Sequence, residues 1–270
     1  MRINTNINAM IATNQMVKNT ALAGKSMEKL STGLRISKAG DDAAGLAVSE
    51  KMRAQIRGME QAERNVQDGI SLVQTAEGGL EEAGNIVQRM RELSVQASNG
   101  TYSDTDREKV IAELTELKDE IAKISEETKF NGTTLLDKAN TFTIQAGANA
   151  EIRAISTVDL SDVANKIDLG NLDAKDGKTF QDLIGVIDGE LEVVNKGRAT
   201  IGAMQNRLEY TSSNLTTSTE NLTAAESRMR DVDVAKEMVK LSKINILNQA
   251  SQAMVAQAKQ QPESVTQLLR

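Results

Sequence analysis

The chain has 270 residues, a formal net charge of −6 and a pI near 5.0, and it contains no histidine, cysteine or tryptophan. This composition excludes Ser-His-Asp and Cys-His catalysis, ordinary zinc and haem sites and disulfide bonds, and its acidic balance argues against a nucleic-acid partner. With 2% aromatic residues and a single proline, Pro262, the sequence favours long helices with a narrow apolar stripe over a compact sandwich or barrel.

The N-terminal segment predicts a helix with a coiled-coil seam. Over residues 3–21 the apolar positions alternate in steps of four and three, which is the a/d pattern of helices that pack along one face. Asn14 is one polar break in this pattern. The predicted seam residues that we expect to pack are Ile3, Ile7, Met10 and Val17.

A second helix is predicted from about Leu46 to Ala97, with Asp41 or Asp42 as its N-cap. Its bulky apolar residues change phase after Val73, where a step of three replaces a step of four. Such a change indicates a local shift of the coiled-coil type.

The middle of the chain predicts a third helix followed by a change of period. Thr105–Glu108 matches a capping box that would begin the helix. Apolar residues then alternate over 142–146 and again over 152–158, where Ile152 and Ala154 are apolar positions, around a turn at 147–149. This pattern predicts a β-hairpin, and the remainder up to Lys178 is expected to be loop.

The clearest periodic signal follows, because an apolar residue stands at every seventh position from Phe180 to Met229. The complementary column is mixed, so the pattern favours a helix that lies against other long helices. The core column of this helix is predicted to be Ile187, Val194, Ile201, Leu208, Leu215 and Leu222.

The C-terminal segment predicts a second end helix. Asp231–Asp233 offers a cap for its start, and Pro262 is expected to fray or kink its final turns. The simplest partner for the N-terminal stripe is the C-terminal stripe, packed antiparallel. The predicted seam residues of this helix are Ile244, Leu247, Met254 and Leu268.

These elements predict a mainly α fold, a long antiparallel helical coiled-coil or bundle rod with a small β-hairpin region. Residues 1–40 and 230–270 would form the two halves of a terminal coiled-coil domain. Residues 41–229 would form a helical rod domain, with a hairpin and loop insert at about 133–178. Ordering costs about 1–2 kcal/mol per residue and each buried Leu, Ile or Met returns roughly 1.5–3 kcal/mol, so we expect the ends to stay loose until copies assemble.

No catalytic, cofactor or metal site is predicted. Gly24–Ser26 echoes the end of a P-loop, but no strand and no first glycine precede it, so a polar helix face is the better interpretation. Asp231 and Asp233 could contact a cation, yet helix capping explains this pair better. An enzyme that uses Asp, Glu or Lys alone stays open in principle, although nothing in the sequence converges on a pocket.

Several long motifs are similar to known sequences. Leu30–Leu46 (LSTGLRISKAGDDAAGL), Asn65–Glu77 and Gln88–Gln96 resemble the N-terminal region of bacterial flagellins. The tail resembles the same family at Asn221–Asp233 and Ile246–Met254. The chain therefore resembles a short flagellin without large outer domains.

The resemblance implies a structural subunit that self-assembles into the helical filament of the bacterial flagellum for swimming motility. It implies that both termini pair as a coiled coil lining the inner tube, with the middle helices in the next shell. It also implies type III export to the extracellular filament, and the N-terminus lacks the apolar region of a cleavable signal peptide.

The resemblance further implies partners besides other copies of the chain. These are an export chaperone at the C-terminal segment, the filament cap and the hook–filament junction proteins. In hosts that have an innate flagellin receptor, the recognised surface would include positions that match Arg89, Leu93 and Glu113.

Two other functions remain as alternatives. The cytoplasmic signalling hairpin of a chemoreceptor is also long and antiparallel, but it needs a membrane anchor and a sharp tip where this chain has a β-pattern. A surface-lipid binder needs bulky aromatics and basic rims on one face. No apolar run approaches the ~20 residues that span a bilayer, so no membrane contact is expected.

Overall fold

The computed structural model describes residues 6–167, 169 and 177–268, and these residues form six helices and two small antiparallel strand pairs. The predicted class, mainly α with a small β region, is confirmed. The chain divides into two compact units. The end unit contains both ends of the chain, up to Ala54 and from Glu220 onward, and the middle unit is Gln55–Thr219.

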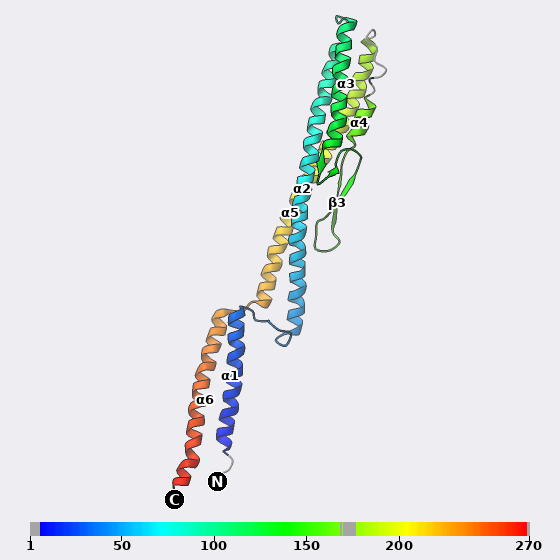
Figure 1. Cartoon of the computed structure of the whole chain (residues 1–270). Helices are drawn as coiled ribbons and strands as arrows, with labels where there is room; N and C mark the ends of the chain where they lie inside the picture. The colour runs from blue at the N-terminus through cyan, green and yellow to red at the C-terminus, as the bar shows by residue number, and fades with distance from the viewer. Residues whose placement is uncertain (1–5, 168, 170–176, 269–270) are drawn as a thin grey trace. The chain divides into compact units, whose positions relative to one another are not determined.

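The end unit is built on two antiparallel helices, α1 (Ile7–Thr32) and α6 (Val234–Leu268). Figure 1 shows them side by side. The Asn6 side-chain amide donates to the Ala258 carbonyl (2.6 Å), and the Ser26 hydroxyl donates to Glu237 Oε1 (2.6 Å). Early residues of α1 thus meet late residues of α6, which is the predicted antiparallel arrangement.

Local signals explain where these two helices begin and end. Asn6 Oδ1 accepts a hydrogen bond from the Ala9 N–H (3.0 Å) at the start of α1, and Gly33 ends it at φ 71°, a conformation that favours glycine. Asp233 Oδ1 accepts from the Lys236 N–H (3.1 Å), so the predicted cap of α6 is confirmed. α6 continues past Pro262 to Leu268, so the predicted fraying there is not observed.

Two longer helices contribute residues to both units. They are α2 (Ala43–Ala97), whose N-cap Asp42 accepts from the Gly45 N–H (2.9 Å), and α5 (Gly177–Arg230). Within the middle unit they run antiparallel, because partners move in opposite directions along the chain. The partners are Arg91 with Asp188 (2.6 Å), Glu81 with Arg198 (3.6 Å) and Glu63 with Thr216 (3.2 Å).

The face that α2 buries in the middle unit keeps one uninterrupted 3–4 spacing. The predicted phase shift after Val73 is therefore wrong. It arose because the small residues Ala62 and Gly69, which carry the seam, were passed over for bulkier neighbours. The buried positions that follow this spacing are Met59, Ala62, Val66, Gly69, Val73, Ala76, Leu80, Ala83, Val87 and Met90.

The third long element of the middle unit is α3 (Asp104–Glu127), which follows α2 after a short turn. Ser103 is its N-cap, since its hydroxyl accepts from the Asp106 N–H (3.3 Å) and donates to Asp106 Oδ2 (2.7 Å). The capping box predicted at Thr105–Glu108 is thus wrong by two residues. The buried Arg107 guanidinium donates to the carbonyls that end α2, at Ala97 (3.1 Å) and Asn99 (3.2 Å).

Two hairpins follow α3. In the first, β1 (Lys129–Phe130) and β2 (Thr133–Thr134) are joined by Asn131 (φ 49°) and Gly132 (φ 80°). Two successive positive φ angles are what a tight type I′ turn requires, and Asn-Gly is the pair that tolerates them best. Each strand has only two residues, which is too short for an alternating pattern to show in the sequence.

The second hairpin is the predicted one. β3 (Thr141–Gln145) pairs antiparallel with β4 (Ile152–Ser156), with Phe142 opposite Ile155. This register turns Ile155 inward (1% exposed) and Ile152 outward (54%), so the expected apolar face of β4 is wrong by one residue. The hairpin lies close to α2, because an added Cβ at Gly58 would come within 2.9 Å of Ala148 Cβ.

A short helix, α4 (Leu160–Lys166), occupies part of the region predicted to be loop. Asp159 caps it by accepting from the Asp162 N–H (2.9 Å), and Leu160 and Val163 are buried. Seven residues are too few for a helical period to stand out in the sequence.

Candidate functional site

The surface between α1 and α6 is lined mainly by small and polar side chains on α1, and by a mixture of polar and aliphatic side chains on α6. On each helix the positions turned toward the other follow the 3–4 spacing of a coiled coil. On α1 they are Ala9, Ala12, Met16, Asn19, Ala23 and Ser26, and on α6 they are Glu237, Leu241, Ile244, Asn248, Ser251, Val255 and Ala258.

Most of the bulky apolar side chains of both helices lie outside this seam. Of the eighteen large apolar side chains that are exposed among the described residues, twelve are on α1 and α6. So many large apolar side chains exposed on one pair of helices indicate an interaction surface. We call these twelve the exposed end face: Ile7, Met10, Ile11, Val17, Leu22 and Met27 of α1, and Val234, Met238, Val239, Ile246, Leu247 and Met254 of α6.

The structure places the predicted N-terminal seam residues on this exposed face. Ile7, Met10 and Val17 are 53–60% exposed. Each stands two positions before a residue of the observed seam, and two positions are about 200° around a helix. The predicted stripe therefore points away from α6, and Ile3 lies outside the described residues.

The predicted C-terminal seam residues divide between the two surfaces. Ile244 is buried against α1, whereas Leu247 and Met254 are exposed. Leu268 is the last residue of α6, and its side chain lies outside the described residues. Within one chain, then, the predicted set does not form a single contact surface, and its packing between copies stays a prediction.

The seam itself holds polar groups that are poorly satisfied. Asn19 is buried with its Nδ2 unpaired, and Asn248 Oδ1 is also buried without a partner. Buried polar atoms without partners weaken packing. At the other end of the seam the Ser26 hydroxyl donates to Glu237, and this hydrogen bond lowers the pKa of the Glu237 carboxyl.

A clamp holds the two chain segments that lead out of α1 and into α6. The Arg35 N–H donates to the Arg230 carbonyl (2.7 Å), and the Val232 N–H donates to the Gly33 carbonyl (2.9 Å). These bonds flank an antiparallel bridge between Leu34 and Asp231. The bridge ties the ends of both helices together in the end unit.

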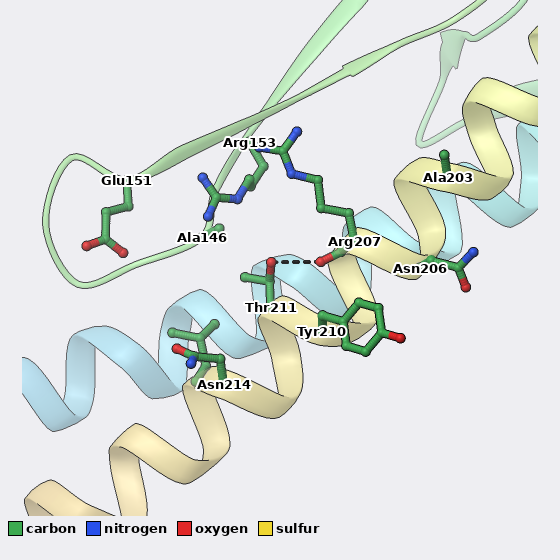
Figure 2. A pocket seen from close by; sticks show the side chains of 10 residues that line it. Ala146, Glu151, Arg153, Ala203, Asn206, Arg207, Tyr210, Thr211 and Asn214 are labelled. Carbon is green, nitrogen blue, oxygen red and sulfur yellow. Dashed lines mark hydrogen bonds between the residues drawn. The ribbon is translucent and has the colours of Figure 1, made fainter.

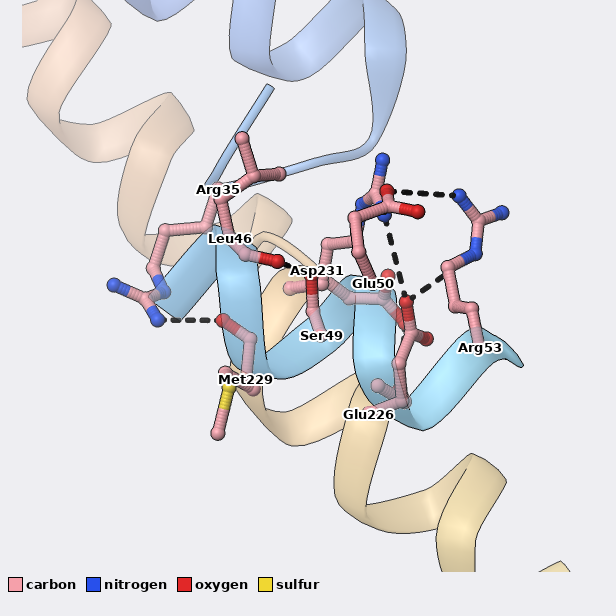
Figure 3. A network of polar contacts seen from close by, with 10 residues as sticks. Arg35, Leu46, Ser49, Glu50, Arg53, Glu226, Met229 and Asp231 are labelled. Atoms are coloured by element: carbon pink, nitrogen blue, oxygen red, sulfur yellow. Dashed lines mark hydrogen bonds and ion pairs between the residues drawn. The ribbon is translucent and has the colours of Figure 1, made fainter. Parts of the chain in front are cut away.

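Ion pairs surround this clamp (Figure 3). The Arg230 guanidinium, 11% exposed, pairs with Glu50 (2.7 Å) and lies 3.9 Å from Glu226. Arg53 contacts Glu50 and Glu226, both at 3.7 Å. Because Arg230 and Glu226 are largely buried, solvent screens their interaction less than that of surface pairs.

The predicted core column of α5 occupies two different environments. Ile187, Val194, Ile201, Leu208 and Leu215 are buried in the middle unit. Leu222 belongs to the end unit and is half-buried.

Two of the three residues assigned to a receptor surface contact one another. Arg89 of α2 pairs with Glu113 of α3 (3.1 Å) and with Glu92 (3.3 Å), and these contacts raise the pKa of the Arg89 guanidinium. Leu93, on the same helix as Arg89, is buried. The accessible part of this surface is therefore charged rather than apolar.

The described residues contain no group of three or more acidic side chains that could hold a metal ion. None of the helices described is long and apolar enough to cross a membrane. Asp231 and Asp233 serve local structure, because Asp231 Oδ2 accepts from the Ser227 hydroxyl (2.5 Å) and Asp233 caps α6.

Seven of the twelve residues of the exposed end face are not predicted by the sequence pattern. The residues outside the single stripe predicted on each helix are Ile11, Leu22, Met27, Val234, Met238, Val239 and Ile246. The available signal was that the two end helices carry apolar residues on more than one side, which is typical of helices with more than one partner.

Comparisons with known proteins show the family to which the chain belongs. The family model described as "Bacterial flagellin N-terminal helical region" matches residues 3–141, and that described as "Bacterial flagellin C-terminal helical region" matches residues 184–269. Flagellin of Halalkalibacterium halodurans is 54% identical over 274 residues, flagellin of Bacillus subtilis is 49% identical over 306, and the flagellar filament 33 kDa core protein of Treponema phagedenis is 46% identical over 287. In all three pairs both chains are fully covered.

Solved structures show the same fold. The crystal structure of Bacillus cereus flagellin matches with a TM-score of 0.52 and 33% identity, over 60% of this chain and 94% of that one. A flagellar hook-associated protein of Vibrio parahaemolyticus, described as putative in its title, matches with a TM-score of 0.61 over 71% of this chain and 100% of that one. At 14% identity the second likeness concerns the fold alone.

Proposed function

The chain belongs to the bacterial flagellin family and is a structural subunit of the flagellar filament, and we propose that its exposed end face is the surface through which copies pack together. The support for this proposal is that bulky side chains such as Met10, Val17 and Met254 stay in solvent in one chain. Burying each of them would contribute roughly 1.5–3 kcal/mol. None of the comparisons favours the chemoreceptor alternative.

The small seam between α1 and α6 fits the same proposal. Ala12, Ser26 and Ser251 bury little apolar area, so the pair is held weakly within one chain and tightens when neighbours cover its outside. In this view residues 1–40 and 230–270 form the terminal coiled-coil domain that lines the filament's inner tube. Residues 41–229, with their insert at about 133–178, form the surrounding shell.

The same exposed face gives export and assembly factors something to bind. Before assembly, the exposed side chains of Ile246, Leu247 and Met254 on α6 would contact water or the same surface of other copies. We infer that an export chaperone covers this C-terminal segment, and that cap and hook–filament junction proteins engage the ends at the growing tip. Export of the chain to the extracellular filament belongs to this proposal.

A host innate receptor would meet the middle unit at Arg89 and Glu113. Both side chains are about half exposed and already hold each other in a fixed geometry. The buried Leu93 would then act by packing, not by contact. We propose no catalytic function for this chain, since its functional surfaces are apolar faces and surface ion pairs.

Substitutions on the exposed end face test the main proposal. The double variant M10D/V17D places two charges on that face, and N8D/Q15D places two charges on exposed polar positions of the same helix. Monomers are checked by circular dichroism, seeded with filament fragments, and followed by light scattering and electron microscopy. We expect M10D/V17D to stay monomeric with normal helicity and N8D/Q15D to polymerise.

Deletions provide a second test. Chains that lack residues 1–30 or 245–270 should remain soluble monomers even when seeds are present. Normal filaments from either deletion, or from M10D/V17D at the wild-type critical concentration, would show that the end face is not the assembly surface.

A further inference from the structure

A hollow of about 430 Å³ lies in the middle unit between the second hairpin and α5 (Figure 2). Arg153 on β4 and Arg207 on α5 both line it, and Figure 2 shows their guanidinium groups close together. Asn206, Tyr210 and Asn214 add amide and phenol groups from successive turns of α5. The lining is thus rich in hydrogen-bond donors.

Neither arginine has an acidic partner in the described part of the chain. No ion pair includes Arg153 or Arg207, and the Arg153 Nε is buried without a hydrogen-bond acceptor. Two like charges repel when they lie close together, and a buried donor without a partner is destabilising. An anion placed between the two groups would relieve both conditions.

The one nearby carboxylate does not perform this role. Glu151 lines the same hollow, but its side chain lies directly against Gly147, where an added Cβ would collide with it. Figure 2 shows the Glu151 carboxylate toward the turn of the hairpin and away from the guanidinium groups. The site therefore lacks an anion from its own chain.

The shape and chemistry of the lining indicate the kind of ligand. A guanidinium donates two parallel hydrogen bonds to an oxyanion, so a pair of them is well suited to a carboxylate. Tyr210 lines the pocket and is 78% exposed, and it is one of only two tyrosines in the sequence. Tyrosine and arginine are the residues that most often anchor protein interfaces.

We propose that this pocket receives a carboxylate from helix α3 of a second copy of the chain, a contact that presupposes assembly of the chain into filaments. α3 carries nine acidic and four basic residues, which makes it a strongly negative surface. Glu116 and Asp119 lie exposed on it, and neither forms an ion pair in the described residues. The contact is heterologous, because a pocket on one copy meets a different surface on the next, and such contacts build open filaments.

Neutralising the arginines tests the pocket. R153Q/R207Q removes two positive charges and leaves polar side chains in their place. The control R57Q/K196Q removes two positive charges at exposed positions of the middle unit that do not line the hollow. The critical concentration for seeded polymerisation at low salt should rise about three- to tenfold for R153Q/R207Q and change much less for the control.

A double-mutant cycle tests the partner surface. E116Q/D119N should raise the critical concentration by a similar factor, and combining it with R153Q/R207Q should add nothing further, because one contact is lost either way. Independent, multiplying effects would overturn the assignment to α3. An unchanged critical concentration in R153Q/R207Q would overturn the pocket itself.

A third measurement separates a second copy from a dissolved anion. Wild-type monomer is titrated with inorganic phosphate and followed by NMR at the arginine Nε–H groups. Saturable binding at millimolar phosphate, together with normal assembly of E116Q/D119N, would assign the pocket to a free anion and overturn the proposal. The polymerisation measurements are made relative to wild-type chains that polymerise, so an unchanged critical concentration in the pocket variants leaves the role of the end face standing.

Discussion

The two units use the same 3–4 spacing but fill it with side chains of different size. In the middle unit, α5 contributes Ile187, Val194 and Ile201 to a core that one chain closes by itself. In the end unit the corresponding positions of α1 are Ala12, Asn19 and Ser26. A 3–4 spacing therefore indicates which face of a helix contacts another helix. The size of the side chains on that face indicates whether the contact buries enough apolar area to hold the two helices together on its own.

This difference predicts different stabilities for the two units in a single chain. Ordering a residue costs about 1–2 kcal/mol, and burial of Ala or Ser returns little of it. The end unit therefore depends on its clamp and on neighbouring copies. The middle unit depends on its own aliphatic core. Four substitutions, taken from the largest expected effect to the smallest, test this contrast.

The largest contrast is between a core residue of the middle unit and an exposed residue of the end unit. Ile201→Ala should lower the free energy of unfolding of the monomer by about 2–5 kcal/mol, because it leaves a cavity. Val17→Ala should change it by less than about 0.5 kcal/mol. Urea unfolding followed by circular dichroism, below the critical concentration, measures both. Equal losses would mean that Val17 already has a partner within the monomer.

The hydrogen bond from Ser26 to Glu237 ties α1 to α6 in the end unit. Ser26→Ala should destabilise this pair by about 1–2 kcal/mol, since it leaves a largely buried carboxylate with fewer partners. Amide exchange in α1 should speed up accordingly, while exchange in the middle unit stays the same. Thr20→Ala, which removes an exposed hydroxyl that bonds its own helix, is the matched control.

The same bond makes a pH prediction for the end unit. The Ser26 hydroxyl lowers the pKa of Glu237 below its ordinary value of 4.5, so the charged carboxylate stabilises the folded pair. That stabilisation is present above pH 4.5 and is lost as the pH falls through the lowered pKa. Exchange in α1 of the wild type should accelerate over that interval, and Ser26→Ala should show a weaker dependence.

Much of the middle unit could be predicted from sequence because one interior explains its pattern. The α5 column stood out through bulky residues at every seventh position, and the caps at Asp42 and Asp233 followed from their place before apolar runs. The capping box failed because Ser103 and Thr105 both begin a matching pattern, and local sequence does not choose between them. The inward face of β4 depends on its register with Phe142, which lies in another strand.

The end unit was harder to predict for a different reason. Hydrophobic periodicity predicts that the bulkiest residues are buried within the chain. A subunit that assembles also buries residues between copies, and the periodicity does not distinguish these two kinds of buried surface. Ile7, Met10 and Val17 gave the stronger pattern, so the small seam of Ala12, Asn19 and Ser26 was overlooked. The same preference for bulk produced the false phase shift in α2.

Removing the polar residue from the seam of the end unit should make the stability of this unit more like that of the middle unit. Asn19 is buried with an unpaired Nδ2, and Asn19→Leu replaces it with an apolar side chain of similar size. We expect the α1–α6 pair to gain about 1 kcal/mol, with slower amide exchange in both helices. Slower filament growth is expected as well, because a polar seam residue fixes helix register. Faster exchange in α1 would contradict this prediction and would indicate that Asn19 has a partner in solution.

The smallest expected effect concerns a charged residue in the core of the middle unit. Glu190 on α5 is 8% exposed, its Oε2 has no partner, and Lys166 pairs with Asp162 (2.6 Å) instead. Burial raises the pKa of the Glu190 carboxyl above its ordinary 4.5, so the charged form destabilises the folded state at neutral pH. Glu190→Gln should therefore stabilise the middle unit at pH 7 by about 0.5–1 kcal/mol. Because the wild-type carboxyl becomes neutral as the pH falls through its raised pKa, this advantage should fade toward pH 4.5, and thermal unfolding at several pH values measures the change. If the extra stability of Glu190→Gln stayed constant with pH, the effect would come from packing and not from charge. The core of the middle unit would then tolerate the charge of Glu190 as well as the seam of the end unit tolerates that of Glu237.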